Sequence, residues 1–128
     1  MPYMELKLSQ EEIDGVLVIR ASGPLDSMNY GAAKDYLDPI LAIPRMRVVL
    51  DCTKLTYINS QGLTLLARYE KMATFALSFF GISNLGPRII KAIEMLGMSK
   101  LVRVFDTVET AVAAAKLLAL DSTPEAAE

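Results

Sequence analysis

The sequence contains no histidine and only one cysteine among its 128 residues. Histidine is the commonest general base near neutral pH, and its absence excludes a Ser-His or Cys-His nucleophile pair within one chain. The same absence excludes zinc sites built from cysteine and histidine. Cys52 has no partner for an internal disulfide, and its place after an apolar run predicts a buried, unreactive thiol. We therefore expect a protein that is not an enzyme.

Other common signals are also missing. The sequence has neither of the glycine motifs G-x-G-x-x-G and G-x-S-x-G. The net charge is only -2, and lysine and arginine are scattered instead of gathered in a basic patch. No apolar run approaches the roughly 20 residues of a membrane-spanning helix, and residues 1–10 do not resemble a signal peptide. We expect a cytoplasmic protein with no cofactor, no nucleic-acid partner and no membrane insertion.

The sequence does contain an alternation of strand-like and helix-like segments. Hydrophobic periodicity and turn residues predict strands at 5–9, 16–22, 47–52, 75–82 and 101–105, and helices at 28–43, 61–76, 87–96 and 107–120. The pair Asp14-Gly15 predicts a hairpin between the first two strands. This order predicts an α/β fold with a mixed sheet of about five strands and about four helices. We expect one domain over residues 1–120 and a disordered acidic tail over 121–128.

Several element boundaries can be predicted from single residues. Gly23 and Pro24 are expected to end the second strand, with Asp26 or Ser27 capping the helix that follows. Pro39 predicts a kink or break near Asp38, because proline removes a helical hydrogen bond. Asp106 and Glu109 have the spacing of a capping box for the last helix.

Two predicted loops, 23–27 and 51–62, follow strands and lead into helices. Loops at the carboxyl ends of parallel strands form the binding face of open α/β sheets. Ser60 stands at the start of a predicted helix, where its hydroxyl could cap unpaired N–H groups. A phosphate on that hydroxyl would also be favoured by the helix dipole. The residues alone leave both roles open, and a cap is the commoner one.

Other residues near these loops have alternative roles. Gly62 leaves no side chain between Ser60 and an incoming group. Asp26 and Asp51 could form a carboxylate pair, although a helix cap is the simpler role for Asp26. Arg68 is most simply part of a solvated helix face.

Three stretches resemble one known family. They are 23-GPLDS-27, 49-VLDCTKLTYINSQGL-63 and 86-GPRIIKAIEMLGMSKLVRVFDTVETAVAA-114. Together they resemble the STAS family, the domain of bacterial anti-sigma factor antagonists, from about Glu5 to Leu120. The family's central motif has an apolar strand ending in Asp, a short loop, and then Asp-Ser before a Gly-Leu pair. The resemblance implies the STAS fold for the whole segment.

The resemblance also implies a partner-switching regulator. In such proteins an anti-sigma factor that is also a serine kinase phosphorylates the serine of the motif, and a serine phosphatase resets it; Ser60 matches that serine. The implied partner-binding face comprises Asp26, Ser27, Thr56, Tyr57, Asn59, Ser60, Gln61, Gly62, Thr64 and Arg68. The family most often has Asp where this chain has Asn59, and a small residue where it has Gln61. Some STAS-like proteins that lack the standard motif dock on transporter ATPases, and this structural role is the alternative.

Overall fold

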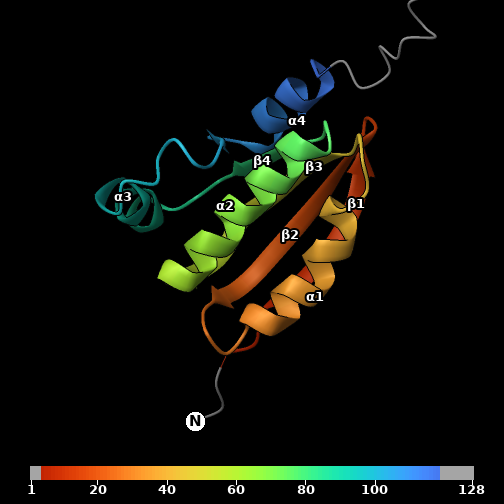
Figure 1. The fold of residues 1–128 in the computed structure, drawn as a ribbon. Helices are drawn as coiled ribbons and strands as arrows, with labels where there is room; N and C mark the ends of the chain where they lie inside the picture. Colours follow the sequence, from red (N-terminus) through yellow and green to blue (C-terminus); the bar gives the residue numbers. More distant parts are fainter. Residues whose placement is uncertain (1–3, 119–128) are drawn as a thin grey trace, which may run out of the picture.

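The computed structural model describes residues 4–118, which form a mixed five-stranded sheet with four helices (Figure 1). The elements in chain order are β1 Lys7–Ile13, β2 Val16–Leu25, α1 Tyr30–Leu41, β3 Arg47–Ile58, α2 Ser60–Phe75, β4 Phe79–Ser83, α3 Pro87–Met95, β5 Val104–Phe105 and α4 Val108–Lys116. The predicted α/β class and the predicted order of strands and helices are confirmed. Residues 119–128, which include the predicted tail, lie outside the described residues.

The strands lie side by side in the order of the chain. β1 pairs with β2 in antiparallel fashion through a two-residue turn at Asp14 and Gly15, and the later strands are parallel neighbours. Both turn residues have positive φ angles, 52° and 81°, as the tight hairpin turns that match strand twist require. The hairpin predicted from the Asp-Gly pair is therefore confirmed.

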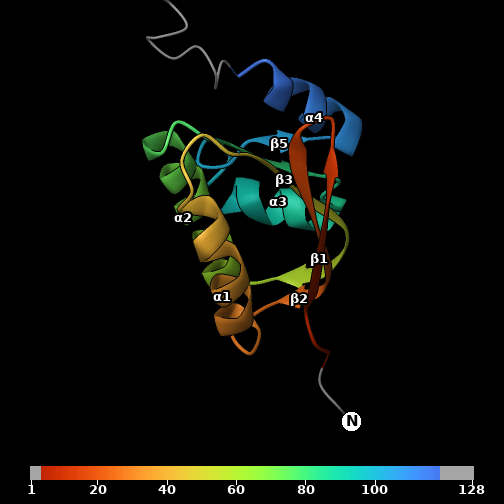
Figure 2. The same cartoon turned by 90° about the vertical axis from the view of Figure 1, so that its right-hand side faces the viewer.

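Alternating side chains of the strands build a core on each face of the sheet. On β2, Ile19 and Ala21 belong to the larger core, which α1, α2 and α3 cover. Val16 and Val18 belong to a smaller core with Ala111 and other residues of α4. Figure 2 shows α4 over one end of its face, and the rest of that face has no helix over it among residues 4–118. One side of β1, β2 and β3 is therefore open.

Both long parallel strands extend farther than predicted. β2 continues through Gly23 and Pro24 to Leu25, so the predicted strand end at this Gly-Pro pair is wrong. Gly23 has a φ of 108°, and a Cβ there would lie 2.7 Å from the carbonyl oxygen of Glu5. Because Gly23 has no side chain, its backbone can lie directly against the backbone of Glu5. β3 runs on to Ile58, so most of the predicted 51–62 loop is strand.

The first helix is continuous through Pro39, and the predicted break near Asp38 is wrong. Pro39 lies in the last turn, so the hydrogen bond that it removes is close to the helix end. Leu37 and Leu41 are buried on the sheet on either side of the proline. Packing of this apolar face on the sheet keeps the segment helical although Pro39 removes one backbone hydrogen bond.

The remaining boundaries shift by a few residues. Residues 75–78 do not belong to β4, because α2 runs to Phe75 and Ser78 N–H then bonds back to Ala73 at 2.7 Å. The capping box of α4 is Thr107 with Thr110, and the predicted Asp106–Glu109 box is wrong by one residue. Thr107 Oγ1 accepts from Thr110 N–H at 3.1 Å, as a capping threonine should.

Candidate functional site

Asn59, and not Ser60, caps the helix that follows β3. Asn59 has extended backbone, and its side-chain Oδ1 accepts a hydrogen bond from Gly62 N–H at 2.9 Å. Its carbonyl accepts the first helical bond, from Leu63 N–H at 3.0 Å. Asparagine is among the best helix caps, so this geometry needs no contribution from the serine. The cap role considered for Ser60 is therefore wrong.

Ser60 is the first residue of α2, and its side chain is exposed. Within residues 4–118, no hydrogen bond involves its hydroxyl, although its carbonyl accepts from Thr64 Oγ1 at 2.9 Å. The first N–H groups of a helix have no helical partner, and they give this end partial positive charge. The hydroxyl is thus accessible at the electropositive end of a 16-residue helix.

Asn59 also joins the two predicted loops. Its Nδ2 donates to Ser27 Oγ at 3.2 Å, and its backbone N–H donates to Leu25 O at 3.3 Å. Ser27 lies between β2 and α1 and is exposed. The ends of β2 and β3 are neighbours, with Leu25 paired to Ile58. The loops therefore lie together at the end of the sheet where α1 and α2 begin (Figure 1).

Asp26 braces the first loop and does not cap α1, so that part of the prediction is wrong. Its Oδ1 accepts from the N–H groups of Met28 and Asn29, each at 3.1 Å. The residue at the N-cap position is Asn29, whose side chain makes no capping bond. Short Asp side chains often bond to the backbone two residues ahead in turns. This local alternative competes with the cap that the sequence predicts.

Asn29 is a structural residue that the sequence analysis missed. Only 2% of it is exposed, and its Oδ1 accepts from Leu6 N–H at 3.1 Å. Its Nδ2 donates to the carbonyls of Met4 and Pro24 at 3.3 and 3.2 Å, and to Asp26. The side chain ties the start of the chain to the loop. A polar residue at a helix start is a weak signal for such burial.

Gly62 is buried, and its missing side chain serves packing. A Cβ at this position would lie 2.8 Å from the carbonyl oxygen of Leu25 and 2.8 Å from Cγ1 of Ile58. The suggestion that Gly62 clears space between Ser60 and an incoming group is therefore wrong. The glycine lets the first turn of α2 lie directly on the ends of β2 and β3, and this contact positions Ser60.

The other predicted face residues are exposed around Ser60. Ser60, Thr64 and Arg68 follow one another at intervals of four along α2, so they share one side of the helix. The remaining exposed members of the predicted face are Thr56, Tyr57 and Gln61. Tyr57 is 54% exposed, and Met28 in the first loop, which the prediction omitted, is 68% exposed. Exposed apolar side chains mark an interaction surface where they form one contiguous patch, whereas single ones are common on protein surfaces.

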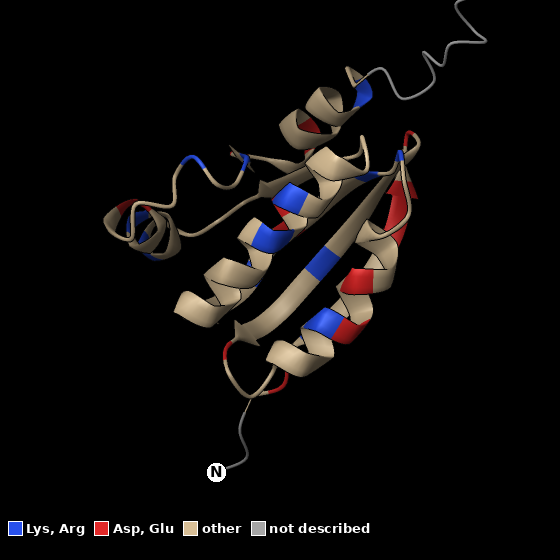
Figure 3. Cartoon of the chain, in the orientation of Figure 1, with Lys and Arg blue, Asp and Glu red and all other residues tan. Residues whose placement is uncertain are grey.

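A hollow of about 650 Å³ lies along the same side of α2. Its lining residues are Tyr30, Thr64, Leu65, Ala67, Arg68, Lys71, Met72 and Phe75. Phe75 at the end of the helix is 94% exposed. Figure 3 shows basic residues on this helix. The hollow is thus apolar with a basic side, and it continues the exposed row that begins at Ser60.

Asp38 of α1 fixes the neighbouring side chains of α2. Its carboxylate accepts from Lys34 Nζ at 2.8 Å and from the Tyr69 hydroxyl at 2.7 Å, and Arg68 lies 3.4 Å away. Partial burial raises the pKa of the Asp38 carboxyl, but the bonds from Lys34 and Tyr69 and the charge of Arg68 outweigh it. The net pKa lies below the ordinary value. Asp38 therefore stays ionised and orients Arg68.

The carboxylates of Asp26 and Asp51 do not form a pair. Asp51 lies opposite Arg20 in the strand register, with 3.5 Å between its Oδ2 and Arg20 Nε, whereas Asp26 lies beyond the end of β2. Cys52 beside it is buried as predicted. Burial, and then the charge of Asp51, raise the pKa of the Cys52 thiol far above its ordinary value. The thiol is therefore protonated and inert.

Residues 4–118 contain no cluster of three or more cysteine, aspartate or glutamate side chains arranged to hold a metal ion. Over the same residues, no helix is both long enough and apolar enough to cross a membrane.

Comparison with known proteins identifies the chain's relatives. Residues 7–111 match the family described as the STAS domain. The chain is 29% identical over 111 residues to a Bordetella bronchiseptica protein described as a candidate anti-sigma factor antagonist, BtrV, covering 87% of this chain and 96% of that protein. It is 26% identical over 106 residues to the anti-sigma F factor antagonist of Paenibacillus polymyxa, covering 80% and 89%. A crystal structure of an anti-sigma factor antagonist from Mycobacterium paratuberculosis matches with a TM-score of 0.76 and 24% identity, covering 87% of this chain and 94% of that one.

Proposed function

We propose that this chain, which belongs to the STAS domain family, is an anti-sigma factor antagonist that changes partners when Ser60 is phosphorylated. Its relatives named as antagonists, each covered over most of its length, support this general role. One observation carries the proposal to Ser60: because Asn59 caps α2, the serine hydroxyl is exposed at the helix start. A hydroxyl engaged in capping would have to leave its bond before it could accept a phosphoryl group.

The helix start favours the charged product. A phosphoserine at physiological pH carries about -1.5 to -2 charges. The partial positive charge and unpaired N–H groups of the first turn stabilise an anion at this position. Ser60 is therefore placed where its phosphate is tolerated by the fold, so that the modification changes the surface without unfolding α2.

The surface around Ser60 is suited to a partner that is partly apolar and partly acidic. Met28 and Tyr57 supply exposed apolar side chains, and Arg68, Lys71 and the exposed Phe75 line the hollow that continues along α2. In the proposed cycle the unphosphorylated face binds an anti-sigma factor. The phosphate then adds negative charge at the edge of that contact and weakens binding by repulsion and by the cost of desolvating the phosphate.

In the proposed cycle, the partner proteins catalyse both phosphorylation and dephosphorylation. The proposed anti-sigma factor acts as the serine kinase and supplies ATP, while a serine phosphatase removes the phosphate. This chain contributes the nucleophilic hydroxyl of Ser60 as substrate and the surrounding face as ligand. Asn59 offers no carboxylate to take the serine proton, so the proposal assigns proton removal to the kinase.

Asn59 also favours a second candidate function, a structural subunit that docks on a transporter ATPase without phospho-regulation. The two functions separate in a capture experiment with tagged protein expressed in its native cells. Wild type, Ser60→Ala, Ser60→Asp and the matched control Ser27→Asp are compared, and bound proteins are identified by mass spectrometry. We expect an anti-sigma factor with wild type, Ser60→Ala and Ser27→Asp, and its loss with Ser60→Asp. Equal capture of a transporter ATPase by all four would support the second function and contradict the first.

A further inference from the structure

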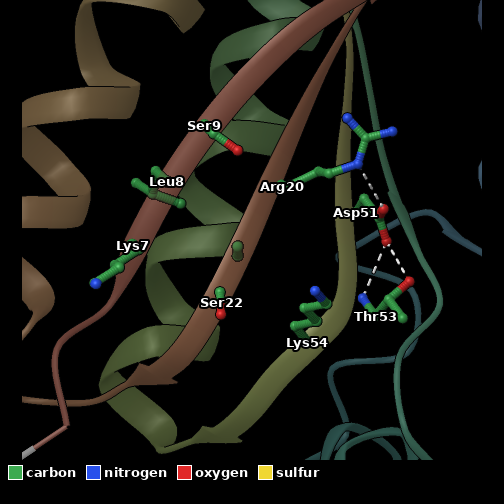
Figure 4. A pocket seen from close by; sticks show the side chains of 9 residues that line it. Lys7, Leu8, Ser9, Arg20, Ser22, Asp51, Thr53 and Lys54 are labelled. Carbon is green, nitrogen blue, oxygen red and sulfur yellow. Dashed lines mark hydrogen bonds and ion pairs between the residues drawn. The ribbon is translucent and has the colours of Figure 1, made fainter.

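The uncovered face of the sheet contains a depression that shares no residue with the contacts around Asn59. It has a volume of about 360 Å³ and lies on β1, β2 and β3 (Figure 4). Its lining residues are Lys7, Leu8, Ser9, Arg20, Ala21, Ser22, Asp51, Thr53 and Lys54. Arg20 and the residues beside it on this face continue the row of Val16 and Val18, beyond the part that α4 covers. The depression is thus separate from α1, α2 and the Ser60 face.

Strand pairing places two lysines on either side of one serine. Lys7 of β1 is the register partner of Ser22, and Ser22 is also the register partner of Lys54 on β3. Directly paired residues point to the same face of a sheet, about 5 Å apart at their Cβ atoms. Lys7, Ser22 and Lys54 therefore form one row across three neighbouring strands, and Figure 4 shows Ser22 between the two lysines, with the Lys7 side chain directed away from Ser22.

An irregularity in β3 brings Lys54 into this row. Arg20 pairs with Asp51, but Ser22 pairs with Lys54, so β3 has one more residue than β2 between these pairs. Asp51 closes the bulge, because its Oδ1 accepts from Thr53 N–H at 3.0 Å and from Thr53 Oγ1 at 2.6 Å. Without the extra residue, Thr53 would lie opposite Ser22. Bulges commonly re-aim side chains in this way beside functional sites.

Two acidic groups on this face, Asp51 and Glu11, share a single cation, Arg20. Asp51 faces Arg20, and Arg20 Nη2 also donates to Glu11 Oε2 at 3.0 Å. Among the ion pairs of residues 4–118, none involves Lys7 or Lys54. Like charges flanking one position repel each other, and an anion between them would remove that repulsion. With Lys7 and Lys54 counted, the five charged groups Lys7, Glu11, Arg20, Asp51 and Lys54 sum to +1, and the two lysines are the cations among them that have no ion pair in residues 4–118.

We propose that this depression binds a small molecule that carries a phosphate group or carboxylate groups. Lys54 and the Ser22 hydroxyl donate to the oxyanion, and the exposed Lys7 side chain rotates toward Ser22 to donate from the other side. Such charge-assisted hydrogen bonds are the stronger class in proteins. The volume is at the lower end of the range for small-molecule pockets and is too small for a helix of a protein partner. The site is independent of Ser60 and of the proposed partner switching.

The test is titration of the isotopically labelled protein with inorganic phosphate and, separately, with succinate, at constant ionic strength, followed by NMR. We expect saturable shifts of the amide signals of Ser9, Ser22 and Lys54 with at least one of the two anions. Phosphate alone identifies a phosphate ligand, and succinate alone identifies a carboxylate ligand. Lys7→Met and Lys54→Met are each expected to weaken binding about tenfold. Lys91→Met, at an exposed lysine of α3, is the matched control and should bind as wild type does.

Any of three results would overturn the proposed anion site. Shifts that do not saturate, or that spread over lysines across the whole surface, would mean general charge screening only. Saturable binding that both lysine variants retain would place the anion elsewhere. Binding to anionic lipid vesicles with no response to either small anion would identify a membrane contact instead. Thermal unfolding of each variant checks that the fold is intact, and substitution of an exposed lysine leaves the core untouched.

Discussion

Asn59 donates a hydrogen bond to Ser27 across 3.2 Å, which links two loops 32 residues apart in the chain. The same side chain accepts from Gly62 N–H and so caps α2. One amide thus holds the neighbouring loop and the helix start, with Ser60 exposed directly beside it. The residue where the chain departs from the usual aspartate of its family is therefore the residue that organises the site.

The first prediction concerns the cap. Asn59→Ala removes the acceptor for Gly62 N–H and should lower the free energy of unfolding by about 1 kcal/mol. Asn59→Asp keeps an acceptor, and the Ser27 hydroxyl can turn to donate to it, so stability should match or slightly exceed wild type. Urea unfolding measures both. Equal stability of the alanine variant and wild type would show that Asn59 does not cap α2.

The second prediction concerns the contact beneath the helix start. Gly62→Ala places a methyl group 2.8 Å from the backbone oxygen of Leu25 and 2.9 Å from its Cγ. Because a backbone atom cannot rotate away, we expect a loss of about 1–3 kcal/mol in the free energy of unfolding. Gly31→Ala, at a helical glycine with open space around it, is the matched control and should be neutral or stabilising. If both variants unfold at the same urea concentration, the close packing of α2 on β2 is wrong.

The third prediction is a pH dependence from Asp38. Since its pKa is lower in the folded protein than in the unfolded chain, its contacts stabilise the fold above the ordinary value of about 3.8 and lose that effect as pH falls through the folded pKa. Asp38→Asn should cost about 1 kcal/mol at neutral pH, and the difference from wild type should shrink in acid. Asp35→Asn, at an exposed residue of the same helix, controls for a general charge effect. A difference that stays constant down to strong acid would contradict this assignment.

The fourth prediction concerns the burial of Cys52 and the exposure of position 60, which a thiol reagent can measure. Cys52 is buried with a raised pKa, so a thiol reagent should label it only after the protein is unfolded. Ser60→Cys in a Cys52→Ala background should react at once in the folded protein. Rapid labelling of native wild type, or slow labelling at position 60, would contradict the burial of one residue or the exposure of the other.

Long periodic segments allowed the fold to be predicted. The exact ends of the helices and strands were predicted less well, because neighbouring residues compete for the same capping position. The Asp14-Gly15 turn and the order of strands and helices follow from patterns over many residues. The caps of α2 and α4 were each missed by one position, because Asn59 and Ser60, and likewise Asp106 and Thr107, are adjacent residues of good capping types. Propensity does not choose between such neighbours; tertiary contacts do.

The candidate face was also predictable in part. Its exposed residues on α2 follow from helical spacing, and the family resemblance points to Ser60. The buried Asn29 and the packing role of Gly62 depend on the approach of β2 and the start of the chain, which sequence patterns do not report. The bulge that aligns Lys54 with Lys7 depends on strand register, which is likewise set by pairing in three dimensions.

The most direct test of the proposed switch is phosphosite mapping of this protein purified from its native cells, together with the variants Ser60→Ala and Ser27→Ala. The two serines lie in the same corner of the molecule, so the second variant is a matched control for accessibility. We expect one phosphoryl group on Ser60 in wild type and in Ser27→Ala, and none in Ser60→Ala. Phosphate that persists in Ser60→Ala, or protein that is never modified at Ser60 while it binds its partner and releases it, would contradict the proposed phosphorylation switch.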